Sequence, residues 1–239
     1  MDLLKVNPLV TVIIPSYNRF ELLCYALLSV EMQTYTPIEI IVADDCSPDP
    51  RYQPEYFTDR GIKYVRTHHN TRTPAEPRNL ALEQATGQYV AMLDDDDQFL
   101  PNHIANGVEF LESHPECSMC CSEAYYNTNE PIYHSDHHYP LTYGEVHRDF
   151  VLQHTGNEKL KSFLTAEDMK QHNWVINSSV LLRREVIDWV GKFRSKLDTG
   201  IFEDYDFWRR MTAYGLIGFL PKPTICYNAM PNWKWHHGT

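Results

Sequence analysis

The sequence predicts an α/β fold built on a mostly parallel sheet that is covered by helices on both faces. In the first half of the chain, apolar segments rich in β-branched residues alternate with stretches of helical periodicity, an order typical of a doubly wound sheet. The strand candidates are continuous apolar runs, which is typical of strands buried on both faces. Ligands of such sheets bind beyond the carboxyl ends of the strands.

The elements of the first half follow from local patterns. Residues 9–14 form an apolar run that Pro15 is expected to end, and apolar residues at helical spacing follow over residues 21–33. A Pro near the start of a periodic segment also indicates a helix, because the first turn leaves its N–H groups unpaired. On these criteria the remaining strands are expected at residues 38–43, 62–66 and 89–93, and the remaining helices at residues 74–85 and 101–113.

The second half of the chain is less regular. Residues 127–172 are polar, rich in His and Tyr and weakly periodic, so we expect loops with one or two short helices. Residues 203–214 have an amphipathic helical pattern that Gly215 ends. The other elements expected here are strands at residues 118–125, 176–182, 217–220 and 224–227 and a short helix at residues 185–190.

The chain has 239 residues, 43% of them hydrophobic, and a formal net charge of -11. This charge argues against a nucleic-acid partner, since such a partner selects a basic surface. No apolar stretch reaches the roughly 18 residues of a transmembrane helix, and residues 1–8 are too short and polar for a signal peptide. We therefore expect a cytoplasmic protein, and peripheral contact with a membrane remains open.

The six cysteines are scattered in a way that indicates reduced thiols instead of a disulfide framework. Cys117 and Cys120 form a CxxC pattern, but a zinc site needs a second pair of ligands at suitable spacing, and none follows. We expect Cys117, Cys120 and Cys121 to be buried in a strand.

Four adjacent carboxylates, Asp94 to Asp97, follow the strand predicted at residues 89–93. They repel one another, and a hard divalent cation relieves that repulsion, because Mg2+ and Mn2+ bind through carboxylates and substrate phosphates. The alternative is a solvated acidic loop. Two other strands end in Pro15–Asn18 and Asp44–Ser47, and parallel strands bring all three segments to the same edge of the sheet.

Five segments follow one another along the chain: residues 10–19, 41–47, 78–81, 92–97 and 202–208. In this order they resemble the motif series of GT-A-fold glycosyltransferases of family 2, over about residues 10–227. The resemblance implies a single GT-A catalytic domain over residues 1–239, with a Rossmann-like sheet and a smaller irregular region. Its nucleotide-sugar half would cover about residues 1–115 and its acceptor-side half about residues 116–239.

The resemblance also implies an inverting, metal-dependent transfer from a nucleotide-diphospho-sugar, with UDP as the expected nucleotide and Mn2+ or Mg2+ as the cofactor. The nucleotide-binding residues that it implies are Pro15, Tyr17, Asn18, Arg19, Asp45, Arg78, Asp94 and Asp95. Tyr17 would contact the base, Asp45 would accept its N–H, and Asp44 is expected to cap the turn. Arg78 suits a diphosphate; alternatively, it pairs with a carboxylate at a strand end.

Within the Asp run, the resemblance makes Asp96 the metal ligand and points Asp94 at the ribose or at Arg78. Because side chains alternate along a strand, Asp94 and Asp96 are expected to project together. Asp97 is expected either to support the metal ligand or to cap the helix after Pro101.

Glu203 and Asp204 resemble the catalytic-base motif of the family. Asp204 is the expected general base, which takes the proton of the acceptor hydroxyl, and Glu203 is the expected neighbour that orients it. The alternative is structural, because acidic residues are favoured in the first turn of a helix by its dipole. His236 is a further candidate metal ligand, and the alternative for it is an exposed terminus.

The expected acceptor is a glycan, a lipid-linked compound or another compound with a free hydroxyl. Its choice is expected to depend on Asn177, Ser178, Asp198 and residues 127–172. The sequence lacks a Gln-x-x-Arg-Trp motif, which favours transfer of a single sugar. A sugar-1-phosphate nucleotidyltransferase would need a glycine-rich turn after the first strand, and a non-catalytic nucleotide-sugar-binding module would not need the acids at residues 96 and 204.

Overall fold

The computed structural model describes residues 6–126, 145–146, 148–149, 152 and 161–228. Its strands are β1 (Val10–Ser16), β2 (Ile38–Asp44), β3 (Lys63–Arg66), β4 (Tyr89–Met92), β5 (Gln98–Phe99), β6 (Cys117–Tyr126), β7 (Glu145–Val146), β8 (Phe163–Leu164), β9 (Leu181–Arg183) and β10 (Leu216–Tyr227). Its helices are α1 (Phe20–Glu31), α2 (Pro54–Thr58), α3 (Ala75–Gln84), α4 (His103–Ser113), α6 (Ala166–Gln171), α7 (Arg184–Val190), α8 (Lys196–Thr199) and α9 (Glu203–Met211), with a 3₁₀ turn at Asn177–Ser179.

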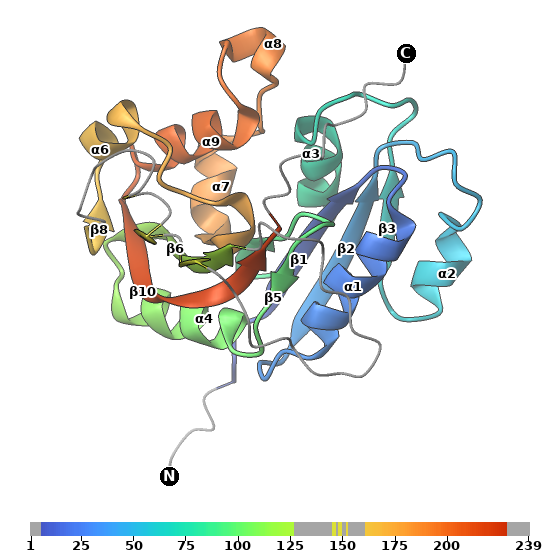
Figure 1. Ribbon diagram of the computed structural model, residues 1–239, viewed down its shortest axis with the longest axis horizontal. Coiled ribbons are helices and arrows are strands. Elements are labelled where there is room, and N and C mark those ends of the chain that lie inside the picture. The colour runs from blue at the N-terminus through green and yellow to red at the C-terminus, as the bar shows by residue number, and fades with distance from the viewer. Residues whose placement is uncertain (1–5, 127–144, 147, 150–151, 153–160, 229–239) are drawn as a thin grey trace.

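The described strands form one sheet with the order β3-β2-β1-β4-β9-β6-β10-β5, to which β7 and β8 add at β6 and β10 (Figure 1). The first four strands are parallel, with Ile13 opposite both Ile41 and Met92. The parallel sheet predicted for the first half is therefore confirmed. Beyond β4 the sheet is mixed, because β9 runs antiparallel to both β4 and β6.

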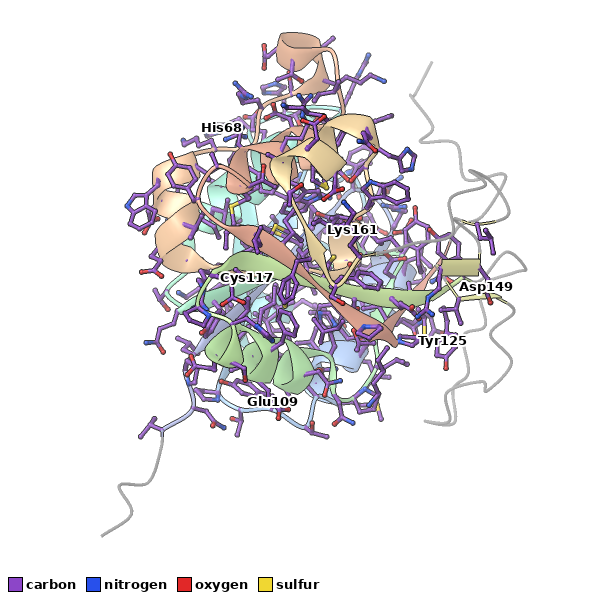
Figure 2. All side chains as sticks on the ribbon, turned by 90° about the vertical axis from the view of Figure 1, so that its left-hand side faces the viewer. His68, Glu109, Cys117, Tyr125, Asp149 and Lys161 are labelled. Atoms are coloured by element: carbon purple, nitrogen blue, oxygen red, sulfur yellow. The ribbon has the colours of Figure 1, made fainter. Side chains whose placement is uncertain are left out.

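Helices cover both faces of this sheet, as the continuous apolar strands predict. Helices α1, α2 and α4 pack on one face in one apolar cluster, and α3, α7 and α9 pack on the other in a second cluster. Figure 2 shows α4, marked by Glu109, on one side of β6 and β10 and the helices of the second half on the other side. The two layers place the carboxyl ends of β1, β2 and β4 at a single edge of the sheet (Figure 1).

Three local predictions are wrong. Pro15 does not end its strand: β1 continues to Ser16, where pairing with β4 has already stopped at Ile13, so the missing N–H of Pro15 costs no ladder bond on that side. The strand predicted at residues 176–182 begins with the 3₁₀ turn and reaches β structure only at Leu181. The two strands predicted near the end are one strand, β10, with irregular register around Pro223.

Helix α2, helix α8 and strand β5 were not predicted, because each is too short to show a period. Helix α6 lies in the segment where one or two short helices were expected. Cys117, Cys120 and Cys121 are buried in β6, as predicted. None of the helices in the described part of the chain has the length and apolar character that crossing a membrane requires.

Candidate active site

The carboxyl ends of three parallel strands bring polar segments together at one edge of the sheet. Ser16 lies opposite Asp44 in the ladder, and the backbone N–H of Leu93 donates to the carbonyl oxygen of Ile13 over 3.0 Å. The segments that begin at Tyr17, Asp45 and Asp94 therefore leave the sheet side by side. We call this edge the strand-end rim.

The Asp run on the strand-end rim is a tight turn. The N–H of Asp97 donates to the carbonyl oxygen of Asp94 over 3.0 Å. The side chains of Asp94 and Asp96 are each 27% exposed, whereas those of Asp95 and Asp97 are buried. Asp94 and Asp96 thus share the open side of the rim as expected, but the cause is the turn and not the alternation of a strand.

Arg19 is the cation beside the middle of the Asp run. Its Nη1 donates to Asp96 over 2.8 Å, and its Nε donates to Asp95 over 3.2 Å. Burial raises the pKa of Asp95 to about 7. The attraction of Arg19 opposes this shift, and the negative charge of the neighbouring Asp96 adds to it. The guanidinium therefore partly balances a pair of carboxylates that would otherwise resist ionisation.

Arg78 joins the strand-end rim to helix α9. Its Nη2 donates to Asp94 over 2.7 Å and its Nη1 donates to Glu203 over 2.8 Å. The ion pair with a strand-end carboxylate, one of the two expectations for Arg78, is therefore present. Arg78 is buried, and its Nε has no hydrogen-bond partner among the described residues. A buried guanidinium N–H without a partner is a donor that an anionic ligand could satisfy.

Helix α9 begins with three acidic residues whose surroundings differ. Glu203 pairs with Arg78, and Asp206 pairs with both Arg194 and Arg210. Among the described residues, the carboxylate of Asp204 accepts only the N–H of Tyr205, over 2.6 Å. Asp204 is therefore the acid of this turn that forms no direct ion pair with an arginine among the described residues.

The surroundings of Asp204 also shift its proton affinity. Burial raises its pKa to about 6, the negative charge of Glu203 adds to the shift, and Arg78 opposes it. A carboxylate with a pKa just below neutrality is ionised at pH 7 and still accepts a proton readily, which suits a general base.

The segment after β2 is held by hydrogen bonds. Asp44 accepts from the N–H of Ser47 over 2.9 Å and from the hydroxyl of Tyr64 over 2.6 Å, so the prediction that it caps the turn is confirmed. Asp45 is buried and accepts from the N–H of Thr71 and the hydroxyl of Thr67, each over 3.0 Å. Burial raises the pKa of Asp45, and these hydrogen bonds oppose the shift.

The loop after β1 lies against the segment after β2. Asn18 has a left-handed backbone (φ 54°), and its N–H donates to the hydroxyl of Ser47 over 2.8 Å. The side chain of Asn18 is exposed, whereas Tyr17 is half-buried next to buried Pro15 and Ser16. Tyr17 and Asn18 thus stand at the surface of the strand-end rim, where a base could reach them.

Two residues that the sequence did not connect with the Asp run, Ser178 and Asn228, form hydrogen bonds with it. The hydroxyl of Ser178 accepts from the N–H of Asp94 over 3.0 Å and donates to Asp97. The N–H of Asn228 donates to Asp97 over 2.9 Å. Asp97 therefore does not cap helix α4, whose preceding residue is Asn102. No local pattern marks these partners, because they come from distant segments.

Asn177 lies beside the nucleotide-side residues, and its Nδ2 donates to Asp94 over 2.9 Å. The Oδ1 of Asn177 has no partner among the described residues. Asp198 lies apart from this group, in α8, and accepts from the hydroxyl of Ser195 over 2.7 Å. His236, and the acceptor-side residues 127–144, lie outside the described residues.

A divalent cation fits the strand-end rim on the chemistry of its donors. The acids gathered there are Asp94, Asp95, Asp96, Asp97, Glu203 and Asp204, and the paired cations are Arg19 and Arg78. Within the described residues no three acidic, His or Cys side chains converge on one point. The rim therefore suits a cation that is held by one or two carboxylates and by substrate phosphates. Asp96, half-exposed, is the residue that would hold it.

Comparison with known proteins identifies the family. The family model described as "Glycosyl transferase family 2" matches residues 11–189. The putative colanic acid biosynthesis glycosyl transferase WcaA of Escherichia coli (strain K12) is 36% identical over 105 residues, which are 43% of this chain and 37% of WcaA. The poly(ribitol-phosphate) beta-N-acetylglucosaminyltransferase TarS of Staphylococcus aureus is 32% identical over 108 residues, 44% of this chain and 19% of TarS. The matched stretch is thus well under half of either relative.

Solved structures show the same fold. The crystal structure of S. aureus TarS superposes on 92% of this chain and 36% of its own, with a TM-score of 0.68 and 20% identity. The mannosyltransferase PcManGT from Pyrobaculum calidifontis, solved with GDP-Man and Mn2+, superposes on 96% of this chain and 59% of its own, with a TM-score of 0.67 and 20% identity. The chain has the GT-A fold and belongs to glycosyl transferase family 2, as its motifs predict.

Proposed function

We propose that this chain is an inverting, metal-dependent glycosyltransferase that moves one sugar from a UDP-linked donor to an acceptor hydroxyl, with Asp204 as the general base. The observation that carries the proposal is the position of Asp204. It is the acid at the start of α9 without an arginine partner among the described residues, and Arg78 links its neighbour Glu203 to Asp94. The guanidinium of Arg78 thus connects the start of α9, which carries the proposed base, to the strand-end rim, where a diphosphate could bind.

The residues divide the reaction between them. Asp204 takes the proton of the acceptor hydroxyl while the hydroxyl oxygen forms its bond to the anomeric carbon. The bond from that carbon to the phosphate oxygen breaks on the opposite side, and the electron pair leaves with the nucleoside diphosphate. A divalent cation held by Asp96 would stabilise the charge on this leaving group. Glu203 and Arg78 keep the base beside the reacting carbon.

The proposed preference for a uracil base is argued from the segment after β2. Asp45 is held by Thr67 and Thr71 with its carboxylate fixed at the rim, where it can accept the N–H of a base, and Tyr17 stands nearby. A structure of TarS was solved with UDP, whereas PcManGT was solved with GDP-Man. The donor nucleotide therefore has to be measured on this chain.

The test is titration calorimetry with UDP, GDP and TDP, each with and without Mn2+, followed by an assay for sugar transfer. We expect UDP to bind only with Mn2+ and to bind more tightly than GDP or TDP. Metal-independent binding without any transfer would instead indicate a nucleotide-binding module. No binding of any nucleoside diphosphate to the folded chain would overturn the proposal.

Replacing Asp96 with Ala should remove the metal-dependent part of UDP binding, because Asp96 would be the protein ligand of the cation. With Mn2+ present, we expect the variant to bind UDP no better than the parent does without the metal. Glu109→Ala, which removes an exposed carboxylate on α4, serves as the control and should leave the metal effect intact. Equal metal dependence in Asp96→Ala and the parent would exclude Asp96 as the ligand.

The rate of transfer should depend on the ionisation of Asp204. Its pKa of about 6 is raised above the ordinary range, and only the deprotonated form accepts a proton. We therefore expect the rate at saturating substrates to increase tenfold per pH unit below about pH 6 and to level off above it. A pH-rate profile at constant ionic strength checks this, and a rate that stays level down to pH 4 would contradict the assignment.

A further inference from the structure

A pocket lies between α6, α8 and α9, and none of the residues that line it belongs to the strand-end rim. Its volume is about 470 Å³, and these three helices gather at one corner of the molecule in Figure 1. The ionisable residues that line it are Lys170, Arg194, Asp198, Asp206, Arg209 and Arg210. We call this the basic pocket.

The charge of the basic pocket is opposite in sign to that of the chain. Four of its ionisable residues are cationic and two are acidic, whereas the whole chain carries a formal net charge of -11. Cations clustered in a concave site of an otherwise acidic protein raise the local concentration of anions. The basic pocket is therefore suited to an anionic ligand.

In the basic pocket, the carboxylate of Asp206 accepts hydrogen bonds from two guanidinium groups. Arg194 and Arg210 each donate an Nε hydrogen bond of 2.9 Å to Asp206. Arg210 also donates to the carbonyl oxygens of Val190 and Lys192, each over 2.8 Å, so its donors are largely used. The side chain of Arg194 remains 51% exposed, and the pair keeps one unbalanced positive charge.

The other two cations are free to turn toward a ligand. Arg209 is exposed and makes no ion pair within the described residues, and its guanidinium carbon lies 5.7 Å from the ring centroid of Tyr205. Lys170 pairs with Glu167 over 3.1 Å, but both side chains are more than half exposed, so this pair contributes little and can be exchanged. Arginine forks and lysine ammonium groups are the side chains that proteins use to bind phosphate.

The basic pocket is close to Asp204 along the chain. Ile201 lines the pocket, and Asp204 follows three positions later in the sequence. Consecutive Cα atoms are about 3.8 Å apart, so the two Cα atoms lie within roughly 11 Å of each other. Asp206, Arg209 and Arg210, however, lie on the face of helix α9 opposite Asp204, so the basic pocket is a site separate from the general base.

We propose that the basic pocket binds a phosphate ester at a site separate from the strand-end rim. This inference goes beyond the proposed function, because none of the residues that line the pocket belongs to that rim. The shared chemistry is a phosphate ester, which a soluble polyol phosphate or a lipid phosphate could supply.

The test measures phosphate-ester binding while the strand-end rim is occupied. The chain is saturated with UDP and Mg2+, and glycerol phosphate is titrated by calorimetry, with uncharged glycerol as the reference ligand. Vesicles of phosphatidylcholine with and without phosphatidic acid, assayed by co-sedimentation, form the lipid arm. Arg209→Gln, Arg209→Lys and Lys170→Gln are the test variants, and Lys222→Gln, an exposed lysine on β10 outside the pocket, is the matched control.

We expect glycerol phosphate to bind and glycerol not to bind. Arg209→Gln and Lys170→Gln should each weaken the affinity by about tenfold, since each removes one charged donor, whereas Arg209→Lys should recover most of the loss and Lys222→Gln should have the parent affinity. Selective binding of phosphatidic acid vesicles would assign the phosphate to a lipid. Thermal unfolding of every variant checks that the fold is retained.

The inference would be overturned if the chain bound UDP but neither phosphate probe, or if Lys222→Gln weakened binding as much as Arg209→Gln. Glycerol phosphate binding without any UDP binding would support the basic pocket and contradict the proposed function. Binding of neither UDP nor a phosphate probe would contradict both proposals.

Discussion

Replacing Asp204 with Asn should lower the rate of sugar transfer by about 10²–10⁴-fold, the contribution typical of a general base, and should leave UDP affinity close to that of the parent. The amide has nearly the shape of the carboxylate but cannot accept the proton of the acceptor hydroxyl. Because the carboxylate of Asp204 makes no ion pair among the described residues, its loss should not disturb the contacts of Arg78. Single-turnover transfer and UDP calorimetry on the same preparation separate the two effects.

The matched control for Asp204→Asn is Asp188→Asn, the same change at an exposed carboxylate of α7 that pairs with Arg184 along its helix. It should transfer sugar at the parent rate. If Asp204→Asn also transferred at that rate, Asp204 would not be the base. If it lost UDP affinity along with transfer, its role would lie in donor binding and not in proton transfer.

Replacing Arg78 with Gln should lower the free energy of unfolding by about 3–5 kcal/mol, because removal of one partner leaves buried carboxylates unpaired. The side chain of Arg78 is 3% exposed and bridges Glu203, 10% exposed, and Asp94, 27% exposed. For a chain of this size the loss corresponds to a melting temperature lower by roughly 10 °C. The bridge joins two segments far apart in the sequence, so UDP binding and transfer should both suffer.

Two controls define the role of Arg78. Arg78→Lys keeps the charge but cannot donate to both carboxylates through a planar fork, so we expect an intermediate loss of stability. Arg60→Gln removes an exposed guanidinium that stacks on Tyr56, and should change the free energy of unfolding by less than about 0.5 kcal/mol. Urea unfolding curves give the three values. A melting temperature of Arg78→Gln equal to that of the parent would show that the bridge does not hold α9 to the rim.

The strongest sequence signals located the strand-end rim because they are local. The apolar runs of β1, β2 and β4 specify buried parallel strands, and parallel strands place Tyr17, Asp45 and Asp94 at one edge. Elements that are short or that depend on remote partners were not predictable in this way. Residues 176–182 were predicted as one strand, and their apolar end does enter β9, yet Asn177 to Ser179 form a turn in which Asn177 and Ser178 hydrogen-bond to the Asp run.

The sequence by itself determined the family, the presence of buried parallel strands in the first half and the acidic segments that follow them, since all of these depend on residue types and spacing within short segments. Only the tertiary structure decided how those acids are balanced. It paired Arg19 with Asp95 and Asp96, bridged Asp94 to Glu203 through Arg78, and placed Asp204 without an arginine partner within the described residues. It also gathered the cations of the basic pocket from α6, α9 and the segment before α8. Charge balance depends on distances between segments remote in the chain, and spacing along the sequence does not contain those distances.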